Sequence, residues 1–240
     1  MMRISRYIYM LVVVSLLACS APPVDAQNIF GRLKDKLSGK STDGDVAKKK
    51  KSGKSAAVVD PAELSLDENV MLPRVGDKQH AAVADYMGHL AKKLASRKLA
   101  RIELTRGGEV IVATIGTDQL FAPNDTVLRD NAQEFLRPYA DLLKQMGMYK
   151  MIVVCHTDDT GSEAYTDHLS EARASAVYDF LFKNQLENVD LLSYALGASE
   201  PSVPNDSREN RAKNRRVEIY IVPDILILEM AKSGKLQFRN

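Results

Sequence analysis

Hydrophobic residues recur at helical spacing in three segments of the chain. They predict amphipathic helices over residues 79–98, about 132–146 and about 163–184. Pro138 lies inside the second segment and should bend or break that helix near Glu134, because proline has no amide hydrogen to donate. The first segment has the clearest stripe, formed by Val83, Tyr86, Met87, Leu90 and Leu94.

Other segments alternate between apolar and polar residues or are apolar throughout, as expected of strands. The first two alternating segments are separated by Gly107-Gly108, which predicts a hairpin turn. The run 150–155 is apolar from Met151 onward, which is typical of a strand buried on both faces. The predicted strands cover 100–104, 109–115, 150–155, 191–196 and 217–221.

The order of these elements predicts the fold class. Strands and helices follow one another as β-β-α-β-α-β-β after the helix at 79–98. We therefore expect an α+β fold, with helices packed on one face of a mixed β-sheet. Residues 79–104 form a leading helix and strand in this reading, and 105–222 form the main domain. The apolar-basic tail, 223–240, has no predicted place.

The amino-terminal region predicts export. Residues 1–26 hold a basic start and an apolar run too short to span a membrane, as in a signal peptide. Two processing sites stay open: lipid attachment at Cys19, after a lipobox-like sequence that begins at Leu16, or cleavage after Ala26. Residues 27–78 then predict a flexible basic linker, with four consecutive lysines at 48–51.

Overall composition excludes several classes of protein. The chain has 33 basic and 31 acidic residues, so its formal charge of +2 gives no reason to expect nucleic-acid binding. Its only two cysteines, in different contexts, exclude a disulfide scaffold or a cysteine-based zinc site.

The densest polar cluster, residues 155–161, follows directly after the buried strand. Asp158 lies in this cluster, and Arg173 lies at the margin of the apolar stripe of the next helix. The two side chains are expected to face one another across a shallow pocket. They form either an ordinary surface ion pair or a zwitterion clamp, in which the carboxylate binds an ammonium and the guanidinium binds a carboxylate.

Blocks of residues at 120–125, 156–165, 169–174, 197–205 and 211–218 follow one another along the chain. In content and order they resemble the OmpA-like peptidoglycan-binding domain. The likeness covers roughly 105–222, about half of the chain, and implies an OmpA-like βαβαβ-type sandwich.

The resemblance implies non-covalent binding of the peptidoglycan stem peptide, with no cofactor and no catalysis. The family's aspartate at Asp158 would bind the ammonium of diaminopimelate, and its arginine at Arg173 would bind the neighbouring carboxylate. Further ligand-binding positions are expected at Thr157, Phe121, Asp125 and Thr166.

Two positions depart from the residues that are usual in this family, and two arginines have an expected role. Thr166 stands where the family favours asparagine, so one hydrogen bond to backbone or ligand should be lost. Cys155 stands where the family has glycine, so its side chain should point into the core or narrow the rim of the pocket. Arg215 and Arg216 are expected to be structural more often than ligand-contacting.

The family also implies a location and partners. We expect the periplasmic side of the outer membrane, where the chain would anchor the membrane or an envelope complex to the wall. The membrane would be reached through lipid on Cys19 or through a partner protein. Whether the protein forms a homodimer or joins an envelope complex stays open.

Two alternatives to wall binding compete with this hypothesis. One is an envelope protein-interaction module that has kept the fold and lost the ligand. The other is a metal-dependent hydrolase that uses His156, Asp158 and Asp159, with His168 nearby. No HExxH motif, nucleophile elbow or glycine-rich phosphate loop supports the hydrolase.

Overall fold

The computed structural model describes residues 60–183 and 189–238. The predicted signal peptide, Cys19 and the linker as far as residue 59 lie outside the described residues. Within the described part, no helix combines the length and apolar character that a membrane crossing requires.

Five strands form one mixed sheet in the order β1-β2-β5-β3-β4, which confirms the predicted fold class. β3 and β4 are parallel, and the other neighbouring strands are antiparallel. The predicted hairpin is β1 and β2, joined through glycines with positive φ at Gly107 and Gly108. The strand bounds are β1 Arg101–Thr105, β2 Val110–Gly116, β3 Tyr149–His156, β4 Leu191–Gly197 and β5 Arg216–Pro223.

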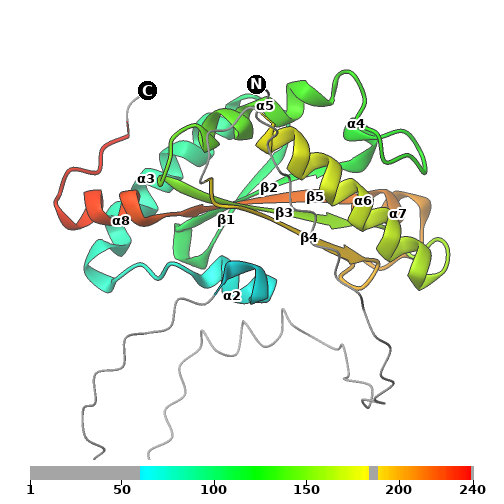
Figure 1. Ribbon diagram of the computed structural model, residues 1–240, viewed down its shortest axis with the longest axis horizontal. Coiled ribbons are helices and arrows are strands. Elements are labelled where there is room, and N and C mark those ends of the chain that lie inside the picture. The colour runs from blue at the N-terminus through cyan, green and yellow to red at the C-terminus, as the bar shows by residue number, and fades with distance from the viewer. Residues whose placement is uncertain (1–59, 184–188, 239–240) are drawn as a thin grey trace, which may run out of the picture. The chain divides into compact units, whose positions relative to one another are not determined.

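The main core lies between one face of this sheet and four helices (Figure 1). Strand alternation explains the choice of face, because Val217, Ile219 and Ile221 of β5 all enter this core while the residues between them face the other way. The four helices are α3 Asp77–Ser96, α5 Ala132–Leu143, α6 Glu163–Phe182 and α8 Ile225–Lys232. The three long helices predicted from the sequence, α3, α5 and α6, are present, and their bounds differ from the predicted ones by a few residues.

The opposite face of the sheet is covered in part by a segment that was predicted to belong to the flexible linker. Residues Pro61–Glu63 form the short 3-10 helix η1, and Leu66–Met71 form α2, which lies across the sheet from the long helices (Figure 1). Leu66 and Val70 pack against a second apolar cluster on that face. The prediction of a linker as far as residue 78 was therefore wrong from residue 61 onward.

Two further regions differ from the prediction. α5 continues through Pro138 without a break, because the buried Leu136, Tyr139 and Leu142 hold it on the core at the cost of one helix bond. The tail also has a definite place. After α8 it returns to α3, where the Phe238 ring lies 5.5 Å from the ring of Tyr86.

Three of the proposed boundaries thus fall within one packed unit. β1 pairs with β2, and α8 joins the same core as α3. The leading segment 79–104 and the tail as far as residue 238 are integral parts of the domain that also contains 105–222.

Candidate functional site

The candidate site lies beyond the carboxyl end of β3, where four segments meet. β3 supplies the Thr157-Asp158 exit, and α6 supplies Arg173. The loop after α4 (Thr117–Leu120) supplies Phe121 and Asp125. The fourth segment is the junction between α7 (Arg208–Asn214) and β5, which supplies Arg215.

Arg173 is a buried cation held by neutral groups. It is 3% exposed, and its guanidinium carbon lies 5.2 Å above the centre of the Phe121 ring. Its Nε donates to the Asp125 carbonyl at 2.9 Å, and Nη2 donates to the Ala122 carbonyl at 3.4 Å. Among the described residues, no carboxylate lies within ion-pair distance of it. Burial lowers the pKa of Arg173, and nearby Arg215 acts in the same direction.

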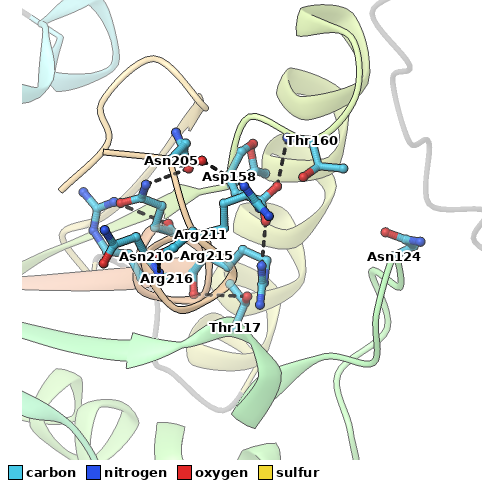
Figure 2. Close-up of polar contacts among 12 residues, drawn as sticks. Thr117, Asn124, Asp158, Thr160, Asn205, Asn210, Arg211, Arg215 and Arg216 are labelled. Atoms are coloured by element: carbon cyan, nitrogen blue, oxygen red, sulfur yellow. Dashed lines mark hydrogen bonds and ion pairs between the residues drawn. The ribbon is translucent and has the colours of Figure 1, made fainter. Parts of the chain in front are cut away.

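Asp158 forms an ion pair with Arg215 and not with Arg173, so the prediction that Asp158 and Arg173 face one another is wrong for this carboxylate. Arg215 Nη1 donates to Asp158 Oδ2 at 2.6 Å, and the Thr160 amide donates to Oδ1 at 3.0 Å (Figure 2). Burial of Asp158 opposes its ionisation, but these hydrogen bonds outweigh burial and lower the pKa of the carboxyl. The positive charge of Arg215 also lowers the pKa of Arg173. Arg215 therefore interacts with both predicted site residues, Asp158 and Arg173.

The main chain of Arg215 is fixed while its side chain is partly free. Its carbonyl accepts hydrogen bonds from the Thr117 amide at 3.0 Å and the Thr117 hydroxyl at 3.3 Å (Figure 2). Its side chain is 39% exposed. The next residue, Arg216, is buried and donates to Glu218 at 2.7 Å, which is the structural role expected of Arg215 or Arg216.

A sequence signal separates these two arginines. Adjacent residues at the start of a strand point to opposite faces of the sheet. Arg216 lies on the same face of β5 as Glu218 and Tyr220, and Arg215, the residue before the strand, does not share that face.

The remaining predicted positions differ in their access to a ligand. The Asp125 side chain accepts hydrogen bonds from the Val127 and Thr126 amides, which lower its pKa and shape the loop. Thr157 is buried, and its hydroxyl donates to the Asp158 carbonyl at 2.9 Å. Thr166 is also buried, and its hydroxyl donates to the Glu163 carbonyl of its own helix at 2.9 Å. The Thr166 hydroxyl is therefore already engaged within α6.

Gly161 allows the loop before α6 to pack closely against the first turn of that helix. Gly161 has a φ of 114°, and a Cβ there would lie 2.8 Å from the ring of Tyr165. The Tyr165 hydroxyl in turn donates to the Asn124 side chain at 3.3 Å, which connects α6 to the loop that carries Phe121.

The residues proposed for a metal site do not converge. His156 is 2% exposed, and its Nε2 lies 3.8 Å from Glu218 on the face of the sheet that carries the second cluster. Asp158 points instead to Arg215. Within residues 60–183 and 189–238, no three histidine, cysteine or acidic side chains are grouped as a metal ion would require. Cys155 is fully buried among core residues, as one of its two expected orientations required.

Residues 120–215, which contain Phe121, Asp125, Asp158, Arg173 and Arg215, match the OmpA family. Outer membrane porin F of Pseudomonas aeruginosa is 34% identical over 111 residues, which are 46% of this chain and 32% of that protein. The peptidoglycan-binding protein ArfA of Mycobacterium tuberculosis is 38% identical over 88 residues, which are 37% of this chain and 27% of ArfA. The match therefore spans about a third or less of either relative's length.

Solved structures show the same fold. The crystal structure of a MotB-like protein from Desulfovibrio vulgaris aligns with a TM-score of 0.54 and 22% identity. The alignment covers 61% of this chain and 96% of that one.

Proposed function

Since residues 120–215 form an OmpA-family domain, we propose that this protein binds the peptidoglycan stem peptide without covalent attachment and anchors the cell envelope to the wall. The ligand group would be the zwitterionic end of a diaminopimelate side chain, which carries an ammonium beside a carboxylate. Arg173 would bind the carboxylate, and Asp158 would bind the ammonium.

The observation that carries this proposal is the buried charge of Arg173. A buried cation is costly unless an anion or several hydrogen bonds compensate it. Arg173 has two neutral carbonyls and an aromatic face as partners, and among the described residues the nearby charge of Asp125 acts on it only from beyond ion-pair distance. An incoming carboxylate would supply the missing counter-charge, and the planar guanidinium favours two parallel hydrogen bonds to it.

The surroundings of this arginine support a small, polar ligand group. The Phe121 ring and the Asp125 and Ala122 carbonyls fix the guanidinium from the side of the loop. A rigid receptor of this kind loses little conformational freedom when it binds. Asp158 lies beyond Arg215 and retains its negative charge, because its pKa is lowered.

The relatives support the same biological setting. One is named a peptidoglycan-binding protein and another an outer membrane porin. We place the protein in the envelope, on the periplasmic side of the outer membrane, as a non-catalytic binder. Its connection to the membrane, by lipid on Cys19 or through a partner protein, belongs to the same proposal.

The proposal can be tested by calorimetric titration with the tripeptide L-alanyl-γ-D-glutamyl-meso-diaminopimelate. Arg173→Lys keeps the charge but cannot form two parallel bonds to a carboxylate. Because hydrogen bonds to charged groups contribute about 1.5–3 kcal/mol, we expect affinity to fall at least about tenfold. Arg137→Lys, on the exposed face of α5, is the matched control and should bind like the wild type. Equal affinity in Arg173→Lys would contradict the assignment, and no binding by any variant would favour a protein-interaction module.

A further inference from the structure

We infer that Arg215 determines the specificity of this site, because it competes with the ligand ammonium for Asp158 and yields only to a ligand that also brings a carboxylate. This inference rests on the proposed function of the Asp158–Arg173 site. It assigns to Arg215 a role in selecting the ligand, in addition to any structural one.

The Asp158 carboxylate is already occupied in the free protein. One oxygen accepts from the Thr160 amide and the other from Arg215, while the side chain as a whole is only 10% exposed. The guanidinium therefore already occupies Oδ2 of the carboxylate (Figure 2). An incoming ammonium would have to compete with Arg215 for Asp158.

Arg215 is built so that only its side chain has to move. Its carbonyl is held by two hydrogen bonds from Thr117, and its amide donates to the Arg211 carbonyl at 3.1 Å. The side chain itself is 39% exposed and makes one described hydrogen bond, the one to Asp158. Release into solvent therefore costs that single ion pair and leaves the α7–β5 junction in place.

The charges decide which ligands can cause this release. In the free site, Asp158 compensates one of the two arginines. A plain amine that took Asp158 would break the ion pair of Arg215 and bring a further positive charge toward Arg173, which has no carboxylate within ion-pair distance and only the more distant charge of Asp125 to oppose it. A ligand with an ammonium and a carboxylate on one carbon adds an anion between the two arginines as it displaces Arg215. The site should therefore favour diaminopimelate over lysine, which lacks that carboxylate.

The test compares two tripeptides that differ by this one carboxylate, ending in meso-diaminopimelate or in L-lysine. Each is titrated by calorimetry into wild type, Arg215→Gln and Arg208→Gln. Arg208 is exposed at the start of α7, the helix that ends just before Arg215, so Arg208→Gln removes one positive charge without touching Asp158.

We expect Arg215→Gln to bind the lysine peptide up to about fivefold more tightly than the wild type, since an ion pair with one partly exposed partner contributes about that factor. The preference for diaminopimelate should narrow by a similar factor, and Arg208→Gln should leave it unchanged. A gain in affinity for one ligand is not an effect that damage to the fold would produce.

Other outcomes separate this inference from the proposed function. If the wild type prefers diaminopimelate and Arg215→Gln retains the full preference, the role of Arg215 is wrong while the site assignment stands. If the lysine peptide binds Arg215→Gln more weakly, Arg215 assists the ammonium and does not compete with it, which also overturns the inference. If the wild type binds neither peptide, the proposed function itself fails.

Discussion

Glu218 is the residue that holds together the polar cluster beneath the site. It accepts hydrogen bonds from Arg216 at 2.7 Å and from the Tyr220 hydroxyl at 2.8 Å, and it lies 3.8 Å from His156. His156 and Arg216 are opposite one another on β3 and β5, two residues before Asp158 and one residue after Arg215 in the sequence. The position of both site residues therefore depends on this buried cluster.

The charge of Glu218 should make stability depend on pH. Burial opposes its ionisation, but His156 and Arg216 outweigh that effect and lower its pKa from 4.5 to about 2. Since the folded-state pKa lies below the unfolded value, the stabilisation is complete above pH 4.5 and is lost as the pH falls toward 2. At pH 7, Glu218→Gln should destabilise the protein by about 3 kcal/mol, because it leaves Arg216 buried without its partner.

Urea unfolding of wild type and Glu218→Gln at pH 7, 4.5 and 3 measures this contribution. The difference in unfolding free energy should be largest at pH 7 and should shrink below pH 4.5. A difference that stays constant over this range would show that the ionised carboxylate is not the source of the effect.

The sequence predicts which residues belong to the candidate site better than it predicts which side chains they contact. Asp158, Arg173 and Phe121 could be found because they belong to ordered blocks at a strand end and on a helix margin. The partner of Asp158 could not be found, because it comes from a junction 57 residues further along the chain. Which of two neighbouring arginines reaches the site depends on the residue at which β5 begins.

At the scale of elements, α2 is a short helix fixed by polar contacts to three parts of the sheet. Asn69 is almost fully buried and donates to the Pro61 carbonyl at 2.7 Å and to the Tyr194 hydroxyl at 2.6 Å. Lys150 Nζ lies 3.5 Å from its side-chain oxygen, and Arg106 donates to the Val70 carbonyl at 2.9 Å. These contacts bind the start of the described chain to β4, β3 and the β1–β2 hairpin.

Removing the Asn69 side chain should loosen α2 without affecting ligand binding. Asn69→Ala leaves the buried Lys150 without this partner and takes one away from Tyr194, which should cost about 1–3 kcal/mol of unfolding free energy. Chemical denaturation measures the loss, with Glu63→Gln on exposed η1 as the control. A loss no greater than that of the control would mean that α2 contributes little to stability.

This helix shows why the element count from sequence was incomplete. Only Leu66 and Val70 of α2 pack on the sheet, too few to give a helical stripe. A local signal was present, since Ser65 and Glu68 form a capping box, with the Ser65 amide donating to Glu68 at 3.0 Å. The long helices and buried strands, in contrast, could be predicted because many residues of each share one face.

At the scale of the whole molecule, both ends of the described chain are held by the same domain. α2 lies on one face of the sheet, while α8 and the tail pack with α3 on the other (Figure 1). Phe238 contacts Tyr86, stacks on His89 at 5.7 Å and lies below the Lys93 ammonium at 5.6 Å. The two ends of the described chain are thus held on opposite faces of one sheet.

The contribution of the tail can be measured separately. Phe238→Ala should lower the unfolding free energy by about 1–2 kcal/mol, less than a fully buried aromatic would cost, because this side chain is only partly buried. Thermal unfolding followed by circular dichroism gives the change, and titration with the diaminopimelate peptide should give unchanged affinity. An unchanged melting temperature would show that the tail does not stabilise α3.

The central claim is that Asp158 and Arg173 bind the cell wall. The most direct measurement is co-sedimentation of the fragment Gly53–Asn240, which contains every described element, with purified peptidoglycan sacculi. Wild type and Asp159→Ala, which alters the exposed neighbouring carboxylate, should sediment with the sacculi, and Asp158→Ala should stay in solution. Sedimentation of Asp158→Ala to the wild-type extent would contradict the account.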